Sequence, residues 1–235
     1  MATEATRLAY LEALGIDVFA LRETQLPASE SASVCERPTR DPDAPPAEPL
    51  DWASLRQAVS SCTRCPLHAG RTQTVFGVGN PEADWMIIGE APGAEEDRRG
   101  EPFVGRAGKL LDEMLRAVGL SRDSVFIANI LKCRPPNNRD PAAAEAEACR
   151  GHLQRQIQLV RPKLILAVGR IAAQQLLGAD ESLGRLRGRV HSLNEPEVPV
   201  VVTYHPAYLL RTPGQKREAW KDLCLARRVI GDQIA

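Results

Sequence analysis

The pattern of hydrophobic and polar positions divides the chain into three zones. Within residues 1–24, leucines recur at helical spacing over residues 5–22, which predicts an N-terminal amphipathic helix. Residues 25–50 lack this period and contain six of the eighteen prolines. We expect a disordered Pro-rich linker there, because such a segment buries too little apolar area to offset the entropy of ordering it. Residues 51–235 alternate short apolar runs with helical patterns, which predicts one folded domain.

The folded domain is predicted to be an α/β protein. Four short apolar runs indicate buried strands, at residues 85–88, 125–131, 163–168 and 198–203. Helical spacing indicates helices at residues 105–118, 141–159, 171–177 and 215–230, and Asp51 is placed to cap a first helix that ends near Ser60. This alternation predicts a three-layer α/β/α sandwich with a central, largely parallel four-stranded sheet.

Polar residues follow the predicted strands at their carboxyl ends. Glu90 comes after the first strand, Asn129 lies near the end of the second, Arg170 follows the third and His205 the fourth. Ligands of such sheets bind beyond the carboxyl ends of the strands, where these side chains meet. A carboxylate, an amide and an imidazole at one rim predict an active site.

Four of the six cysteines have the spacing of a metal-binding set. Two form a Cys-x2-Cys pair, one follows the second strand and one lies in the next helix, namely Cys62, Cys65, Cys133 and Cys149. Four thiolates suit zinc and an iron–sulfur cluster equally by ligand type. The alternative is that they are buried as small apolar residues, which is also our interpretation of the two cysteines without partners, Cys35 and Cys224.

Charge and composition restrict the kinds of partner. The chain has a formal net charge of zero, but residues 1–50 carry nine acidic side chains and four arginines, which leaves a balance of +5 for residues 51–235. A nucleic-acid contact is therefore expected from a local basic surface. The N-terminus lacks the pattern of a signal peptide, and no stretch approaches the roughly 18 apolar residues of a membrane span, so we expect a cytoplasmic protein with no membrane partner.

Three loops admit a structural and a functional interpretation. The acidic run at residues 95–97 is interpreted as a solvated helix start in preference to a metal site. Phe103, in a loop rich in glycine and proline, is either a core residue or a platform for a flat heterocycle. Leu209 and Leu210 either pack inward or wedge into a DNA base stack, with Arg211 beside them for phosphates.

Five short segments carry a resemblance to a known family. They are CTRCPL (62–67), GEAPGAEED (89–97), GEPFVGRAG (100–108), NILKCRPPNNRDP (129–141) and HPAYLLR (205–211). In this order they resemble the family 4 uracil-DNA glycosylases, the iron–sulfur branch of the uracil-DNA glycosylase superfamily. The resemblance covers about residues 55–231 and leaves residues 1–50 outside it.

The resemblance implies a cofactor and a set of site residues. It implies a [4Fe–4S] cluster on Cys62, Cys65, Cys133 and Cys149. It implies a uracil pocket made by Gly89, Glu90, Ala91, Phe103, Asn129 and His205, with Glu90 and His205 as the catalytic residues. The residues expected to contact DNA on the surrounding loops are Arg134, Arg139, Leu209, Leu210 and Arg211.

The chemistry of uracil agrees with these implied roles. A uracil flipped out of the helix would stack on Phe103, and the Asn129 amide would pair with N3–H and O4, the edge that separates uracil from cytosine. His205 would donate to O2, where negative charge grows as the N-glycosidic bond breaks. In the best-known branch of the superfamily an aspartate that positions water stands where this chain has Ala91, so Glu90 is expected to act as base or water-positioner.

The expected activity is therefore that of a monofunctional uracil-DNA glycosylase, a hydrolase that leaves an abasic site in single- or double-stranded DNA. Residues 97–100 lack the arginine-rich, histidine-bearing insertion of a relative that forms a covalent product, and no lysine is placed for Schiff-base chemistry. The alternative is an iron–sulfur DNA-binding module without base release. A nucleotide-binding protein is disfavoured because no Walker-type or GxGxxG sequence follows the first strand. We expect a monomer, with residues 5–22 either packed on the domain or docking a protein partner.

Overall fold

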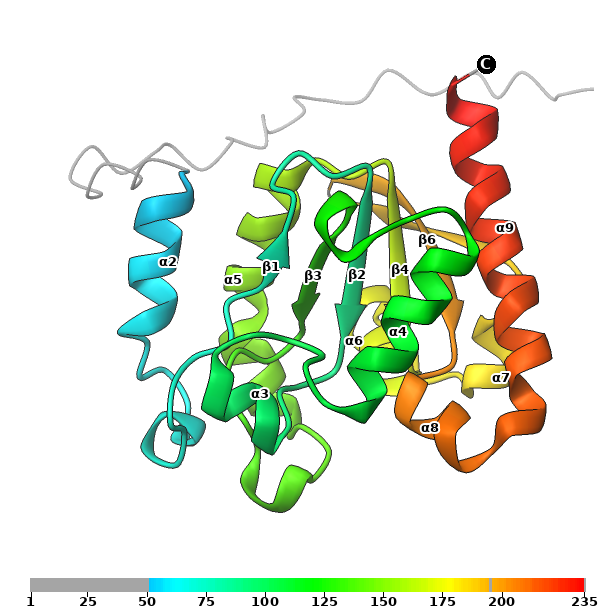
Figure 1. Ribbon diagram of the computed structural model, residues 1–235. Coiled ribbons are helices and arrows are strands. Elements are labelled where there is room, and N and C mark those ends of the chain that lie inside the picture. The colour runs from blue at the N-terminus through cyan, green and yellow to red at the C-terminus, as the bar shows by residue number, and fades with distance from the viewer. Residues whose placement is uncertain (1–50, 195, 235) are drawn as a thin grey trace, which may run out of the picture. The chain divides into compact units, whose positions relative to one another are not determined.

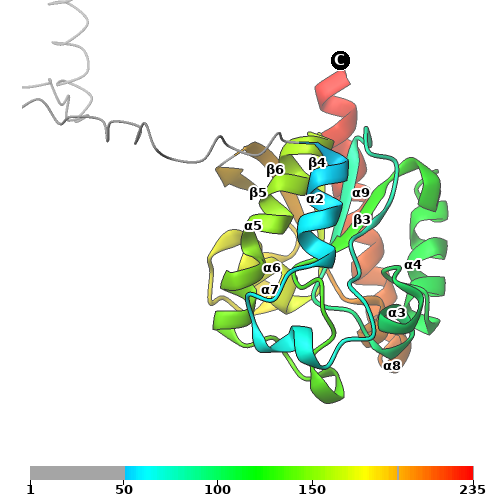
Figure 2. The ribbon, with the colours of Figure 1, turned by 90° about the vertical axis from the view of Figure 1, so that its left-hand side faces the viewer.

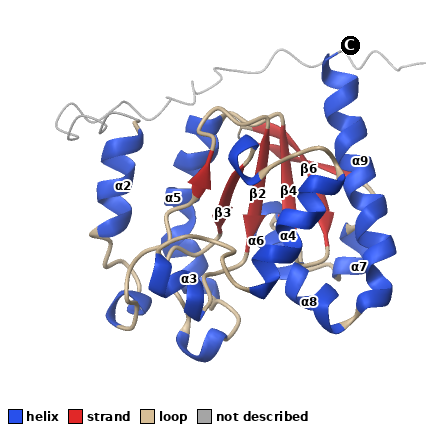
Figure 3. Ribbon diagram, in the orientation of Figure 1, coloured by secondary structure: helices blue, strands red, loops and turns tan. Residues whose placement is uncertain are grey.

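The chain folds around one sheet with helices on both of its faces. The computed structural model describes residues 51–194 and 196–234, so the helix predicted over residues 5–22 and the linker predicted over residues 25–50 lie outside the described residues. Six strands form the sheet, and helices cover it on either side (Figures 1 and 3). The predicted three-layer α/β/α architecture is confirmed, whereas the predicted number of four strands is wrong.

The two additional strands lie at the edges of the sheet. In chain order the strands are β1 (Val78–Gly79), β2 (Trp85–Gly89), β3 (Phe126–Asn129), β4 (Leu164–Val168), β5 (Val190–Asn194) and β6 (Glu197–Thr203). Their order in space is β1-β3-β2-β4-β6-β5. The four central strands are parallel and are the four that the apolar pattern predicts, whereas β1 and β5 pair antiparallel with β3 and β6. An edge strand pairs on one side only and needs no continuous apolar run, so neither edge strand stands out in the sequence.

The predicted helices are present with small shifts at their ends, and two short helices, at residues 183–186 and 206–211, are not predicted by the pattern; the second forms where a loop was expected. The helices are α2 (Trp52–Ser60), α3 (Ala94–Arg99), α4 (Arg106–Ala117), α5 (Ala143–Val160), α6 (Arg170–Leu177), α7 (Leu183–Leu186), α8 (Pro206–Arg211) and α9 (Lys216–Ile234), with short 3-10 turns at Pro66–Ala69, Arg122–Ser124, Pro136–Asn138 and Pro213–Gln215. Asp51 caps α2 as predicted, because its carboxylate accepts the Ser54 N–H at 2.8 Å. Helix α5 begins at Ala143, two residues later than predicted, because the Glu145 carboxylate reaches back to the Ala142 N–H at 2.9 Å.

Alternate residues of the central strands face the two helical layers. One hydrophobic core lies toward α2, α5 and α6 and includes Met86, Ile88, Ile165 and Ala167 from the strands. The other lies toward α4 and α9 and includes Ile87, Leu164, Leu166 and Val168. Figure 2 shows α2 beside α5 on the first of these faces. Every residue of β2, β3 and β4 is buried, which fits strands covered on both faces.

Strand register places the carboxyl ends of the central strands at one edge. Gly89 of β2 pairs with Asn129 of β3, and Val168 of β4 pairs with Thr203 of β6. The arrowheads of β2 and β3 point to the edge where α3 and α8 lie (Figure 1). The loops that follow these strands therefore share one rim. Within the described ranges, no helix is long and apolar enough to cross a bilayer.

Candidate active site and cysteine site

A cavity of about 480 Å³ opens at this rim. Five of the six predicted uracil-binding residues line it, namely Glu90, Ala91, Phe103, Asn129 and His205. Its other lining residues include Glu96 of α3, Arg139 of the loop before α5, and Tyr208 and Arg211 of α8. The structure thus brings together side chains that are more than 100 positions apart in the sequence.

Gly89, the sixth predicted residue, lies directly behind the cavity. A Cβ atom on Gly89 would lie 2.5 Å from Asn129 Oδ1 and 2.6 Å from Cζ of Phe103. The side chains of Asn129 and Phe103 therefore occupy space that the Cβ atom of any other residue at position 89 would fill. Beyond the strand ends, the Ile130 N–H donates to the Gly89 carbonyl at 2.9 Å and the Leu131 N–H to the Glu90 carbonyl at 3.1 Å, which extends the pairing of the two loops into the site.

His205 is held as a neutral hydrogen-bond donor. It stands at the N-cap of α8, where its Nδ1 accepts the Ala207 N–H at 3.1 Å, so the ring proton lies on Nε2. Burial, with a smaller contribution from Arg211, lowers the pKa of His205 to about 4 against the opposing effect of Glu96. The imidazole stacks against the Phe103 ring with 5.6 Å between centroids and 29° between planes. At neutral pH the site therefore offers an uncharged N–H in a fixed direction.

Glu90 is a carboxyl group with an environment unlike that of a surface glutamate. Burial, with a smaller contribution from Asp140, raises the pKa of Glu90 to about 7 against the opposing effect of Arg170. Asp140 and Arg170 form an ion pair of 2.9 Å at the end of β4. The carboxyl of Glu90 therefore exchanges its proton near neutral pH, which suits a group that activates or orients water.

The acidic run at residues 95–97 has a role that the sequence did not predict. Only its first residue, Glu95, conforms to the predicted solvated helix start, and it pairs with Arg98 at the surface. Asp97 is only 4% exposed, and both of its carboxylate oxygens accept the Thr72 N–H, at 3.0 and 3.1 Å. Glu96 accepts the N–H groups of Val104 and Gly105 at 3.0 and 3.2 Å. Two of these carboxylates thus hold loops around the site, and neither spacing nor composition marks that role.

The four predicted cysteines line one small pocket beside the active site. Cys133 and Cys149 are buried and Cys62 and Cys65 are partly exposed, and the pocket is completed by Arg64, Arg71, Lys132 and His152. Arg71 donates to Cys133 Sγ at 3.2 Å and to the Cys62 carbonyl at 2.9 Å. Cys224 lies on α9 and does not line this pocket, which agrees with its interpretation as a cysteine without partners. Cys35 is outside the described residues.

Lys132 joins the cysteine pocket to the active site. Its ammonium group is fully buried and donates to the Asn129 carbonyl at 2.7 Å and to Gln156 Oε1 at 2.6 Å. Gln156 in turn donates to the Phe76 carbonyl at 2.8 Å. The sequence analysis missed Lys132, because nothing in the pattern shows which way a lysine beside a cysteine points.

The cysteine pocket has the donors of a thiolate centre. Four thiols and no carboxylate line it, which is a soft ligand set that selects zinc or an iron–sulfur cluster. In the described part of the chain, no three Cys, His, Asp or Glu side chains are arranged to hold a single metal ion. The buried Lys132 and the partly exposed Arg71 supply positive charge next to the thiols.

The predicted DNA-contacting residues divide between surface and core. Leu209 is 1% exposed and packs in the core between the sheet, α4 and α9, so its prediction as a DNA wedge is corrected, whereas Leu210 is 37% exposed. Because α8 turns by about 100° per residue, two successive leucines cannot face the same way. Arg211 lines the cavity, and Arg139 also lines it while holding Glu145 through bonds of 2.6 and 2.8 Å. Arg134 lies outside the cavity lining and donates to Asn138 at 2.8 Å.

Known proteins share most of this domain. Residues 76–226 match the model of the Uracil DNA glycosylase superfamily. The chain is 45% identical over 181 residues to a type-4 uracil-DNA glycosylase of Archaeoglobus fulgidus, covering 74% of this chain and 90% of that relative. It is 45% identical over 159 residues to the type-4 enzyme of Thermotoga maritima (67% and 82% covered).

Comparison with a more distant relative shows which branch of the superfamily the chain resembles more. The chain is 30% identical over 189 residues to a type-5 uracil-DNA glycosylase of Pyrobaculum aerophilum, which covers 66% of this chain, against 43% over 182 residues to the type-4 enzyme of the same organism. The matched segment contains the rim and two of the four pocket cysteines. The chain belongs to the uracil-DNA glycosylase superfamily, and within it to the type-4 uracil-DNA glycosylases.

Proposed function

We propose that this protein is a monofunctional uracil-DNA glycosylase, which flips deaminated uracil out of DNA and hydrolyses its N-glycosidic bond to leave an abasic site for base excision repair. The observation that carries the proposal is the convergence of a neutral His205 donor, the Asn129 amide and the Phe103 ring on one cavity at the strand ends. The names of the type-4 relatives agree with it.

Uracil is selected by its hydrogen-bonding edge. The Asn129 side chain accepts from N3–H and donates to O4, while the Phe103 ring stacks on the flat face of the base. Cytosine presents an acceptor at N3 and a donor at N4, so both bonds to the same amide orientation would be lost. Asn129 is 3% exposed and packs against the Gly89 backbone, which restricts the amide to one place.

The reaction is cleavage of the bond between N1 of uracil and C1′ of the sugar by water. As this bond breaks, its electron pair moves onto the base, and the Nε2–H of His205 donates to O2, where the negative charge develops. Because the His205 imidazolium has a pKa of about 4, the ring is neutral at pH 7, and its remaining Nε2–H stabilises the departing anion through a hydrogen bond. Glu90 orients the attacking water or accepts its proton, and the oxygen of that water forms the new bond to C1′.

The chain is expected to release an abasic site without cutting the strand. Among the described residues that line the cavity there is no lysine, so no amine is placed to form a Schiff base with the sugar. The segment from Asp97 to Gly100 carries no histidine that would attach to C1′. Water is therefore the nucleophile.

Cys62, Cys65, Cys133 and Cys149 hold a [4Fe–4S] cluster in this proposal. When bound, the cluster ties together the turn after α2, the loop after β3 and helix α5 as one cross-link, and it takes no part in bond cleavage. Arg71 and Lys132 offset the negative charge of four thiolates. Because Lys132 also binds the Asn129 carbonyl, this cross-link supports the residue that reads uracil.

DNA lies across the rim in this proposal. Leu210 wedges into the base stack, and Arg211, Arg134 and Arg139 contact phosphates around the flipped nucleotide. The protein works as a monomer in the cytoplasm, on single- or double-stranded DNA, and residues 5–22 dock a protein partner.

The decisive experiment is release of uracil from a defined oligonucleotide. Iron-loaded protein is incubated with a strand that carries one uracil, followed by alkali, which cleaves abasic sites. We expect cleavage at the uracil position and none in the matched strand with thymine. Intact strands together with measurable DNA binding would instead support the alternative, an iron–sulfur DNA-binding module without base release.

A further inference from the structure

The backbone of Phe103 has an unusual conformation. Its φ angle is +56°, in the left-handed region that residues with a side chain rarely adopt. A residue of this kind persists only where its surroundings hold it. The tip of the Phe103 ring is packed against Gly89 and the ring stacks on His205, so its position depends on how the loop is restrained.

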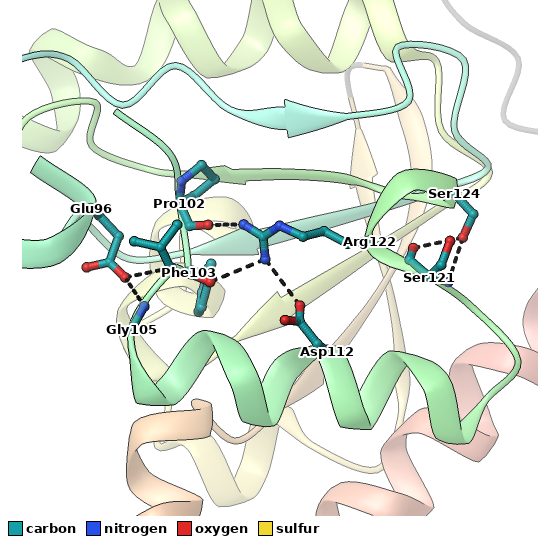
Figure 4. A network of polar contacts seen from close by, with 9 residues as sticks. Glu96, Pro102, Phe103, Gly105, Asp112, Ser121, Arg122 and Ser124 are labelled. Carbon is teal, nitrogen blue, oxygen red and sulfur yellow. Dashed lines mark hydrogen bonds and ion pairs between the residues drawn. The ribbon is translucent and has the colours of Figure 1, made fainter. Parts of the chain in front are cut away.

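Arg122 supplies the restraint from one side (Figure 4). Its guanidinium donates to the carbonyl of Phe103 at 3.2 Å and to the carbonyl of Pro102. The same group is oriented by Asp112 of α4, at 3.2 Å. One planar cation thus binds two successive carbonyl groups at the strained residue, which a side chain with a single donor cannot reproduce.

The loop is restrained from the other side as well. Glu96 accepts the N–H groups of Val104 and Gly105, immediately after Phe103 (Figure 4). Gly108 of α4 allows the Phe103 carbonyl to approach the helix, since a Cβ atom there would lie 1.7 Å from that oxygen. The carbonyls of Pro102 and Phe103 therefore bind a cation, and the N–H groups of the next two residues bind a carboxylate.

The base of the Arg122 side chain is itself fixed. Arg122 begins the 3-10 turn Arg122–Ser124, in which the Ser121 N–H donates to Ser124 Oγ at 2.9 Å and Ser124 Oγ donates to the Ser121 carbonyl at 2.9 Å. Arg122 does not line the cavity, so it has no direct contact with a base bound there. Any effect of Arg122 on uracil must therefore pass through the Phe103 loop.

We propose that Arg122 is a positioning residue for uracil recognition, because it holds the Phe103 ring at the depth and tilt at which a flipped uracil stacks. The proposal rests on the proposed function of the cavity. Without Arg122, two carbonyls lose their donor and the left-handed backbone of Phe103 relaxes, so the ring moves toward the space that the base would occupy. Uracil then binds more weakly although every residue that touches it is still present.

The test is a double-mutant cycle that measures inhibition of the iron-loaded enzyme by free uracil. Arg122→Gln is expected to weaken uracil binding about 10-fold, close to the loss of one base–aromatic stack. Phe103→Leu should weaken uracil binding by a similar factor. The double variant should bind uracil no more than about twofold more weakly than Phe103→Leu alone, because both changes remove the same interaction. The pH dependence of excision should not change.

The matched control is Arg116→Gln. Arg116 also forms an ion pair on α4, with Glu113 at 2.7 Å, but it is exposed and away from the loop, so uracil inhibition should match that of the wild type. If Arg122→Gln does not fold, Asp112→Asn tests the same restraint by removing the carboxylate that orients the guanidinium, and Arg122→Lys should recover only part of the affinity.

Two results would overturn the assignment. One is that the Arg122 variants are inhibited by free uracil within twofold of the wild type. The other is that Arg122→Gln weakens uracil binding by the same factor in the Phe103→Leu background as in the wild type, which would mean that Arg122 does not act through the ring. A wild type that releases no uracil from DNA would refute the proposed function instead, so the two failures are distinguishable.

Discussion

The cavity at the strand ends and the cysteine pocket lie next to each other and are built from different kinds of residue. The cavity holds two ionisable groups with strongly shifted pKa values, about 7 for Glu90 and about 4 for His205. The cysteine pocket holds four thiols and no carboxylate, and burial there also shifts pKa values, to about 8 for Lys132 and to about 4 for His152. Shifted pKa values therefore do not separate the two regions; a carboxylate and an imidazole suit proton transfer and hydrogen bonding to a substrate, whereas four thiols suit a metal centre.

The two regions are joined by a short piece of chain. Only three residues separate Asn129 from Cys133, and one of them, Lys132, bonds back to the Asn129 carbonyl. A change in the cysteine pocket can therefore reach the recognition amide through backbone and one buried ammonium group. The comparison predicts that changes in the cavity alter the rate and leave bound iron unchanged, while changes in the cysteine pocket lower bound iron and stability first and the rate as a consequence.

The largest expected effect follows from His205→Ala. Loss of one donor to the developing anion should slow uracil excision by about 100-fold or more. Iron content should stay close to that of the wild type, and loss of the α8 cap should lower the thermal midpoint by only about 2–4 °C. Single-turnover rates on a uracil oligonucleotide measure the effect, and His191→Gln on β5, outside the cavity, is the control. A rate within threefold of the wild type would show that His205 does not contact the leaving base.

A second prediction concerns the scaffold. Cys149→Ala removes one thiol from a buried pocket and should reduce bound iron and lower the thermal midpoint by about 10 °C, which corresponds to roughly 3 kcal/mol for a domain of this size. Cys224→Ala, a change of the same type on α9, should leave both quantities unchanged. Equal iron content in the two variants would contradict the assignment of the cluster to the four pocket cysteines.

The smallest effect concerns the pH dependence of excision. With the pKa of Glu90 at about 7, the rate should rise by about tenfold between pH 6 and pH 8, and Glu90→Gln should flatten that rise. The His205 ring, with its pKa at about 4, should not titrate in this range. A slope that survives in Glu90→Gln would assign the titration to another group.

The same glutamate gives a check on stability. Its pKa is raised in the folded state from an ordinary value of 4.5 to about 7, so the unfolded chain releases this proton first as the pH rises. Glu90 therefore lowers the stability of the fold progressively between these two values, and the cost stays constant above them. Glu90→Gln should be more stable than the wild type at pH 8 and no more stable at pH 4.

Much of the fold follows from local patterns in the sequence. Continuous apolar runs identify the four central strands, because strands buried on both faces must be apolar at every position. The order of strands and helices then places Glu90, Asn129 and His205 at one rim, since parallel strands all end at the same edge. The spacing of the cysteines and the five matching segments identify the family before any coordinates are considered.

Other features depend on contacts between distant parts of the chain. The edge strands β1 and β5 exist only because β3 and β6 offer them partners, and Leu209 differs from Leu210 only through the direction in which α8 packs. Tertiary contacts also decide the tautomer of His205, the burial of Asp97 and the hydrogen bonds from Arg122 to the Phe103 loop. The sequence by itself determined which residue types meet at the rim, because periodicity and strand order are local properties. Only the tertiary structure decided how those residues are aimed and charged, because burial and hydrogen-bond partners come from segments that local patterns do not relate.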